Sequence, residues 1–319
     1  MGRMVALLAF GLLAGHALGQ NAFPSKPITM VVGFEPGGGT DGVARVVAKF
    51  LGDNLGQQVL VENRAGAGGD IAVDYVAHAA PDGYTIVLAN VGSVAVNPHL
   101  LKLHYDPFAD LSPISMATIF PNVIVVHPNV PAKTLAEFVK LARENPGKIT
   151  FGSSGVGGAG HLAGDLLAIM ANVKLVHVPY KGGGPAMRGL LGGEIDAYFA
   201  TPIASITQIH AGRARALAVT SLQRSKLMPD VPTVAESGYP GYEALNWYAY
   251  FAPGKTPREV IERLNREIVK VLRMPQAIAL LEKQGVDPAP DTPEALAAYL
   301  KREYDRWGKL VKERNIKPE

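Results

Sequence analysis

The 319-residue sequence contains no cysteine, and this absence excludes several kinds of chemistry. Disulfide bonds, thiol nucleophiles and thiolate metal sites all require cysteine side chains. A lipid-anchored receptor of the bacterial type would also carry a cysteine directly after its cleaved leader. We therefore expect a protein without covalent cross-links and without a lipid anchor.

Charge is also sparse. Charged residues make up 18% of the chain, and 31 Lys and Arg against 28 Asp and Glu give a formal net charge of +3. This excess is too small over such a length to indicate binding to nucleic acid or to a membrane surface. No run of Lys and Arg alternates with aromatic residues, as a groove that follows a nucleic-acid backbone requires. A nucleic-acid partner is not expected.

Long hydrophobic runs are lacking except at the N-terminus. Arg3 precedes an apolar stretch over residues 5–13, and small residues at 17–19 offer a cleavage position before Gln20. This pattern predicts a cleaved signal peptide over residues 1–19, since a transmembrane helix needs about 20 apolar residues. An exported chain without a lipid anchor is retained only by an outer membrane. We therefore expect a periplasmic protein.

Glycine, in contrast, is abundant and gathers where apolar runs end. After the apolar run at residues 28–34, residues 35–42 contain three consecutive glycines and lead into apolar positions at helical spacing. Residues 152–158 and 180–184 repeat this arrangement, and Pro185 is expected at the first position of a helix. Glycine leaves the backbone N–H groups of a helix start open to an anion. Each segment therefore predicts a strand, an anion-binding loop and a helix.

The rest of the chain alternates between strand and helix patterns. Strands are expected at residues 59–61, 84–88, 122–126, 149–151, 175–178, 195–199 and 216–219, and helices at 71–80, 134–144, 161–170, 186–191 and within 256–312. Repeated β-α units predict mostly parallel sheets with helices on both faces, and this length is enough for two lobes. Ligands of such sheets bind outside the carboxyl ends of the strands. Two facing lobes would enclose a small anion there.

A dinucleotide site is the first alternative for the leading glycine segment. Residues 37–42 match the GxGxxG pattern, and Glu62 follows Gly42 by 20 residues, where a ribose-binding acid is expected. However, Glu35 and Pro36 separate the strand from the glycines, where the dinucleotide pattern needs a tight turn. An exported chain also meets few nicotinamide cofactors. We expect no cofactor.

Candidate catalytic groups are not paired in the sequence. Ser153 and Ser154 lack the GxSxG pattern of a nucleophile, so they are expected to donate hydrogen bonds to a carboxylate. His161 has two interpretations, as a donor to an anion or as a residue that holds the loop. Asp41 is expected to cap a helix, with contact to a ligand amine as the alternative. No HxxxH or HExxH spacing indicates a metal site. We therefore assign no catalytic residue and expect no enzyme activity.

Three further side chains near these segments have a structural and a functional interpretation. Lys181 is expected to be solvated, although it could balance the charge of a ligand. Trp247 and Tyr248 lie in an apolar run and are expected in the core, with the wall of a ligand cleft as the alternative.

Several longer motifs resemble the Bug family, the periplasmic solute receptors of tripartite tricarboxylate transporters. They occur in order between Pro24 and Gly308, at residues 36–41, 61–69, 81–85, 161–164, 177–182 and 229–236. The resemblance implies a two-lobed, Venus-flytrap α/β fold whose lobes are joined by two crossing hinge strands. Lobe 1 is then expected over residues 24–117 and 222–319, and lobe 2 over residues 118–221.

The resemblance also implies a function. The ligands of the family are mostly small carboxylates, so the chain is expected to bind one between its lobes, as a monomer, and to deliver it to the membrane subunits of a transporter. The alternatives are a periplasmic hydrolase or dehydrogenase acting on a small acid, and a sensor that docks on a signalling protein. The implied ligand contacts are Phe34, Gly38, Gly39, Thr40, Asp41, Asn90, Ser93, Ser154, Gly158, His161, Ala200 and Thr201.

Three places depart from the usual pattern of the family. Residues 157–160 are small where hydroxyl residues are common, Gly183 replaces a frequent serine, and Ala200 occupies a position that is often acidic. These changes remove side-chain donors and a partner for a ligand ammonium group. We therefore expect a carboxylate held mainly by backbone N–H groups, and a low affinity for acidic amino acids.

Overall fold

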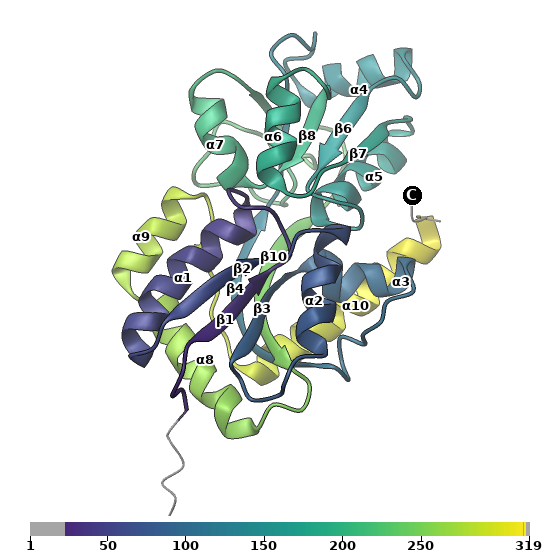
Figure 1. The fold of residues 1–319 in the computed structure, drawn as a ribbon. Helices are drawn as coiled ribbons and strands as arrows, with labels where there is room; N and C mark the ends of the chain where they lie inside the picture. Colours follow the sequence, from purple (N-terminus) through teal and green to yellow (C-terminus); the bar gives the residue numbers. More distant parts are fainter. Residues whose placement is uncertain (1–22, 315, 317–319) are drawn as a thin grey trace, which may run out of the picture.

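The computed structural model describes residues 23–314 and residue 316. The predicted signal peptide, residues 1–19, lies outside this range. The described chain forms two mixed β-sheets, each flanked by helices and one above the other in Figure 1. We call the part built on the six-stranded sheet lobe 1 and the part built on the five-stranded sheet lobe 2.

The sheet of lobe 1 has the strand order β11-β4-β10-β3-β1-β2. Its strands are β1 (Ile28–Val32), β2 (Val59–Asn63), β3 (Thr85–Asn90), β4 (Leu111–Pro121), β10 (Leu245–Pro253) and β11 (Asp287–Pro288). β1 pairs in parallel with β2 and β3, whereas β10 lies antiparallel between β3 and β4. Side chains alternate across β1, so Met30 and Val32 join one core and Val31 joins the other.

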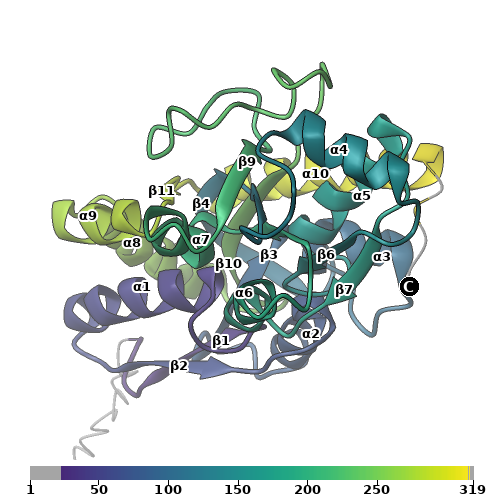
Figure 2. The same ribbon diagram turned by 90° about the horizontal axis from the view of Figure 1, so that it is seen from above.

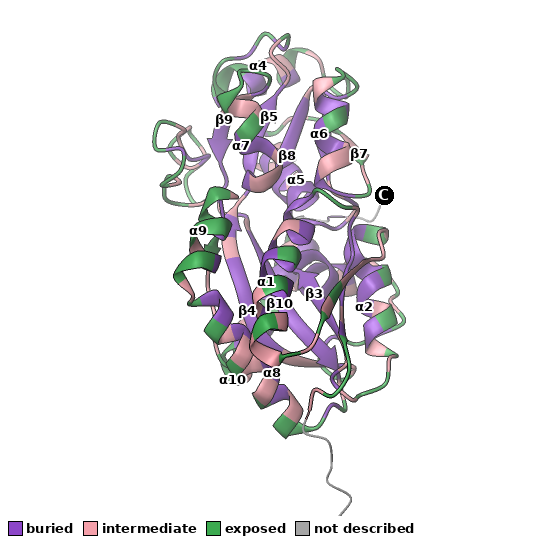
Figure 3. Ribbon diagram, turned by 60° about the vertical axis from the view of Figure 1, so that its left-hand side comes forward, coloured by how far each residue is buried: buried purple, intermediate pink, exposed green. Residues whose placement is uncertain are grey.

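Helices cover both faces of this sheet, as Figures 1 and 2 show. The face of Met30 packs against α1 (Gly39–Leu55), α8 (Arg258–Leu272) and α9 (Pro275–Lys283). The opposite face is covered by α2 (Asp70–Ala77), α3 (Asn97–Leu100) and α10 (Pro293–Arg314), with the short turns η1 (Ala67–Gly69) and η2 (Gly92–Val96). Exposed residues lie on the outer faces of α1 and α9 (Figure 3).

The sheet of lobe 2 has the strand order β7-β6-β8-β5-β9. Its strands are β5 (Val123–Val126), β6 (Thr150–Ser153), β7 (Val176–Pro179), β8 (Ala197–Ala200) and β9 (Arg215–Val219). One face packs against α4 (Leu135–Glu144) and α5 (Ala159–Ala171), the other against α6 (Gly183–Leu191) and α7 (Pro202–His210). α4 begins where the Thr134 hydroxyl accepts the N–H of Glu137, a side-chain N-cap.

Thr220 joins the two passages of the chain between the lobes. The first passage runs from β4 through Asn122 into β5, and the second runs from β9 through Thr220 to β10. The Thr220 hydroxyl accepts the N–H of Asn122 at 2.8 Å and donates to the carbonyl of Ala244 at 2.7 Å. Thr220 N–H also donates to the Asn122 carbonyl. Behind the sheets, Leu310 of α10 packs against the cores of both lobes.

The expected two-lobed α/β class is confirmed, with two passages of the chain between the lobes. The expectation of mostly parallel sheets is wrong. β10 and β11 pair antiparallel in lobe 1, and β5 pairs antiparallel with β8 and β9 in lobe 2, because the chain returns from the other lobe into each sheet in the opposite direction. The lobe boundaries at 117/118 and 221/222 stay predictions. Pro185 is the third residue of α6 and not its first, because the helix already begins at Gly183. No helix of residues 23–314 combines the length and the apolar character that a membrane span requires.

Candidate functional site

A small cavity lies between the two lobes, and we call it the core cavity. Lobe 1 and lobe 2 both line it, with Phe34, Gly38, Gly39, Thr40, Asn90, Asn246 and Tyr248 from the first and Ser154, Ala159, Gly183 and Thr201 from the second. Its volume is about 10 Å³. A cavity of about 10–15 Å³ holds a single water molecule. The two lobes are therefore closed onto each other around this point.

Four helices begin at the core cavity. Gly38 is the N-cap of α1, Ala159 and Gly183 are the first residues of α5 and α6, and Thr201 is the N-cap of α7. The first N–H groups of an α-helix have no partner within the helix, and that end carries a partial positive charge. None of these four N-caps is closed by a side-chain hydrogen bond. The arrangement suits an anion held by backbone N–H groups from both lobes.

The first residue of α1 must be glycine. A Cβ atom on Gly39 would lie 2.6 Å from the hydroxyl of Tyr248 and 3.1 Å from Oγ1 of Thr201. Since Tyr248 belongs to lobe 1 and Thr201 to lobe 2, the start of α1 is enclosed from both sides. A side chain here would have to push the lobes apart.

Two buried polar atoms at the core cavity have no hydrogen-bond partner within the described chain. They are Oγ1 of Thr201 and Oδ1 of Asn246, and both residues are 5% exposed. A buried polar group without a partner destabilises the folded state by about 1–3 kcal/mol. Their position at the cavity wall indicates a bound ligand that supplies the missing hydrogen bonds.

The described wall of the core cavity contains no charged side chain. Among the described residues that line it, none is Asp, Glu, Lys, Arg or His. The charge of a bound anion would therefore be met by helix ends and hydroxyl groups. Across the described residues, no group of three or more His, Cys, Asp or Glu is arranged to hold a metal ion.

Asp41 lies behind the wall of the core cavity and holds the glycine segment. Its carboxylate accepts hydrogen bonds from the Gly37 N–H at 3.1 Å, from Arg45 Nε at 3.0 Å and from Asn63 Nδ2 at 2.9 Å. Burial alone would raise the pKa of Asp41, but these hydrogen bonds outweigh it and lower the pKa. The N-cap position itself is occupied by Gly38. Asp41 therefore fixes the loop from the third position of the helix.

His161 also supports a loop. Its Nδ1 accepts the Gly157 N–H at 3.0 Å, and its Nε2 lies 3.2 Å from Oδ2 of Asp165. The ring stacks on His177 with 4.0 Å between the ring centroids. This geometry corresponds to the loop-holding interpretation of His161.

A serine–histidine contact lies beneath the same loop, where the sequence indicated none. Ser153 Oγ is 2.7 Å from His177 Nε2 and donates to the carbonyl of Gly155 at 2.9 Å. Burial lowers the pKa of His177 to about 4, so its ring is neutral near pH 7. Because Ser153 is fully buried, this contact shapes the loop.

The structure brings seven of the twelve expected contact residues to the wall of the core cavity. Asp41, Ser93, Gly158, His161 and Ala200 are not among the lining residues. Ser93 instead donates to the side-chain oxygen of Asn90 at 2.9 Å and fixes that carboxamide. The lining residues that sequence reasoning missed are Ala159, Gly183 and Asn246, whereas Tyr248 lies at the cleft wall, as its alternative interpretation had it. Trp247, between the last two, is fully buried in the core of lobe 1.

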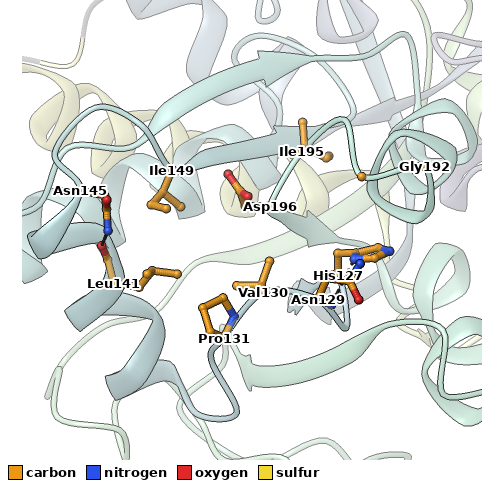
Figure 4. Close-up of a pocket in the computed structure, with 11 residues that line it drawn as sticks. His127, Asn129, Val130, Pro131, Leu141, Asn145, Ile149, Gly192, Ile195 and Asp196 are labelled. Atoms are coloured by element: carbon orange, nitrogen blue, oxygen red, sulfur yellow. Dashed lines mark hydrogen bonds between the residues drawn. The ribbon is translucent and has the colours of Figure 1, made fainter.

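A larger cavity of about 580 Å³ lies in lobe 2, away from the core cavity, and Figure 4 shows its lining residues. Two of its polar side chains have partners within the lobe. Asp196 Oδ2 accepts hydrogen bonds from the N–H and the hydroxyl of Thr150, and Asn145 Nδ2 donates to the Leu141 carbonyl. Nothing in this wall matches the converging helix ends of the core cavity, which is therefore the better candidate site.

The sequence matches a known family along most of its length. Residues 43–316 match the tripartite tricarboxylate transporter family receptor. A UPF0065 protein encoded in the tcbD-tcbE intergenic region of Pseudomonas sp. strain P51 is 43% identical over 314 residues, which cover 98% of this chain and 94% of that protein. Protein BugT of Bordetella pertussis is 37% identical over 322 residues and covers 99% of both chains.

Solved structures with bound ligands share the fold. Rpa4515 of R. palustris, solved with adipate, has a TM-score of 0.90 and 34% identity, and the match covers 93% of this chain and 100% of that one. MatC (Rpa3494) of Rhodopseudomonas palustris, solved with bound malate, has a TM-score of 0.87 and 31% identity, with 91% and 100% covered.

Proposed function

This chain belongs to the tripartite tricarboxylate transporter receptor family, and we propose that it is a periplasmic receptor that binds a small organic carboxylate in the core cavity. The observation that carries the proposal is the meeting of four uncapped helix N-termini at one uncharged cavity. The adipate and malate bound to two structural neighbours support the same ligand class.

A carboxylate that enters the core cavity has to leave water. Burying an ionised carboxylate is very unfavourable unless hydrogen bonds replace its hydration. Charge-assisted hydrogen bonds from backbone N–H groups are strong, and each helix end contributes the equivalent of about half a positive charge. α1 comes from lobe 1 and α5, α6 and α7 come from lobe 2, so a bound carboxylate would hold the lobes together. Ligand binding would then favour the closed arrangement.

Delivery to the membrane subunits of a transporter is the next step of the proposal. The family match supports it, and a closed receptor would present a different surface from an open one. We propose binding without turnover, because Ser153, the serine in contact with a histidine, is fully buried and hydrogen-bonded to the Gly155 carbonyl.

The experiment is isothermal titration of the purified protein with a panel of carboxylic acids and with the primary amide of each acid. We expect at least one acid to bind, and its uncharged amide to bind at least tenfold more weakly. Gly39→Ala should abolish binding, because its Cβ would lie 2.6 Å from the Tyr248 hydroxyl. Gly52→Ala is the control, because Gly52 lies in the same helix outside the core-cavity wall and its Cβ would approach a carbonyl of the same lobe, that of Gln57, at 3.2 Å. Full affinity in Gly39→Ala would contradict the proposed site.

A further inference from the structure

A second cavity adjoins the core cavity at the interface of the lobes, and we call it the side cavity. The two cavities share the walls Phe34 and Ser154. The remaining lining residues are Gly33, Gly66, Ala67, Gly68, Gly155, Val156, Pro179, Tyr180 and Lys181. Like the core cavity, it is bounded by loops of both lobes.

The chemistry of the side cavity differs from that of the core cavity. Its side-chain walls are mainly the rings of Phe34 and Tyr180 and the aliphatic groups of Ala67, Val156 and Pro179. No helix of eight or more residues begins among its lining residues. Lys181 is its one charged residue. A carboxylate against these walls would find Lys181 as its one charged partner among the described lining residues, whereas an apolar group would gain from burial against the rings and aliphatic groups.

The volumes of the two cavities decide which part of a ligand each can hold. The core cavity measures about 10 Å³ and the side cavity about 160 Å³. A dry apolar cavity of about 150 Å³ in another protein accommodates benzene. In the closed arrangement the core cavity has room for about one carboxylate oxygen, which is the size of a water molecule, so the rest of the acid has to extend elsewhere. The adjoining side cavity has room for a six-membered ring.

Phe34 is fixed between the two cavities. Its side chain is 6% exposed, and its carbonyl accepts Asn63 Nδ2 at 2.9 Å. A Cβ on Gly69 would lie 3.5 Å from the edge of the ring, an ordinary van der Waals distance, so the chain at Gly69 packs beside the ring. The ring therefore has a defined place from which it can contact a ligand that spans both cavities.

We propose that the ligand is a carboxylic acid with an apolar body the size of a six-membered ring. This inference rests on the proposed function and adds the substrate class. The carboxylate occupies the core cavity, the apolar body occupies the side cavity, and Phe34 determines specificity as their common wall. Short acids with two carboxylates are disfavoured, because the second charge would face walls that are mainly apolar and, among the described lining residues, Lys181 alone could oppose it.

Isothermal titration of the wild-type protein with cyclohexanecarboxylate, benzoate, acetate and succinate tests the inference. We expect a ring acid to bind at least tenfold more tightly than acetate and succinate. Val156→Phe, which narrows the side cavity, should weaken binding of the ring acid at least tenfold and leave acetate affinity unchanged. Val176→Phe is the control, because Val176 is 40% exposed on β7 and lines neither cavity.

The outcomes separate the two proposals. If acetate or succinate binds as tightly as the ring acids, the side cavity is not the site of an apolar body, although the protein is still a carboxylate receptor. If none of the four acids binds and no acid of the wider panel does, the proposed function itself fails. Circular dichroism checks the fold of Val156→Phe, and Ala67→Leu provides a second variant. If neither folds, the ranking of acids by the wild type decides.

Discussion

The backbone N–H of Glu35 donates to the carbonyl of Lys181 over 3.0 Å, and this hydrogen bond links the first glycine segment of lobe 1 to the third segment of lobe 2. Gly182 approaches the same point, where an added Cβ would lie 3.2 Å from the Glu35 nitrogen. The lobes therefore meet backbone to backbone along this line. Closure depends on residues that have no side chain to keep the lobes apart.

Gly157→Ala should impair closure. Gly157 in lobe 2 has a φ of +70°, and its added Cβ would lie 1.6 Å from Oδ1 of Asn97 in lobe 1. The lobes could close only after a shift, so we expect ligand affinity to fall at least tenfold in isothermal titration. Gly147→Ala is the matched control, with the same φ of +70° and nothing within 4 Å. Both variants should lose about 1 kcal/mol of stability from the strained backbone. Equal ligand affinities in the two variants would contradict the role of this contact.

Thr201→Val should separate ligand binding from stability. The Thr201 hydroxyl is buried at the core cavity without a partner in the described chain, and it does not cap α7. Valine keeps the shape, so the free energy of unfolding should stay the same or rise, while ligand affinity falls by about 1–3 kcal/mol. Thr118→Val removes another buried, unpartnered hydroxyl that does not line the core cavity, and it should leave affinity unchanged. Urea unfolding and titration measure both quantities.

Asp70→Asn should change how stability depends on pH. Burial raises the pKa of Asp70 to about 7, although Asn97 Nδ2 donates to it at 2.7 Å and the Tyr105 hydroxyl at 3.1 Å. Between pH 4 and 7 the folded protein therefore binds this proton more readily than the unfolded chain does. The stabilisation is complete below the unfolded pKa, near 4, and is lost as the pH rises through 7.

The variant should match the wild type at pH 4 and exceed its stability at pH 8 by at least about 1.4 kcal/mol, the equivalent of one pKa unit. Urea unfolding at pH 4, 6 and 8 measures the difference. The lowered pKa of His177 acts in the opposite direction, but it is present in both proteins and cancels. Asp53→Asn, at an exposed position, is the control. A constant difference across this pH range would show that Asp70 does not titrate there.

Amino acids should bind more weakly than the same acids without the ammonium group. Helix N-termini carry partial positive charge, and no described residue that lines the core cavity is acidic. An ammonium group next to the bound carboxylate would therefore find no ionic partner. We expect 3-phenylpropanoate to bind more tightly than phenylalanine, and glutarate more tightly than glutamate. Competitive titration against a bound acid gives both ratios, and a preference for the amino acids would refute this expectation.

The sequence predicts well what depends on local chemistry. The glycine segments lead from β1, β6 and β7 into α1, α5 and α6, because strand pattern, glycine and helical spacing follow one another along the chain. β4, β10, α7 and the π-turn η2 were missed. β4 owes its eleven residues to pairing with β10, which is more than a hundred residues away. Such pairing leaves no local signal.

Some residues of the candidate site could not be predicted either, because their positions depend on long-range strand pairing. Asn246 and Tyr248 lie in a continuous apolar run, where the residue pattern does not reveal which face of the strand borders the core cavity. Ser153 meets His177 because β6 and β7 are parallel neighbours in one particular register. Registers of this kind are fixed by packing across the whole lobe. The glycine loops therefore predicted one part of the cavity wall from the sequence. The part formed by β10 could be identified only from the three-dimensional structure.

Both tryptophans of the chain, Trp247 and Trp307, are at most 1% exposed and belong to one hydrophobic core of lobe 1. Lobe 2 thus has no intrinsic fluorophore of this kind. Since the sequence has no native thiol, a cysteine introduced at Val176 could be labelled uniquely with an energy-transfer acceptor. Energy transfer from the two tryptophans of lobe 1 to a single dye on lobe 2 would then report the opening and closing of the lobes in real time.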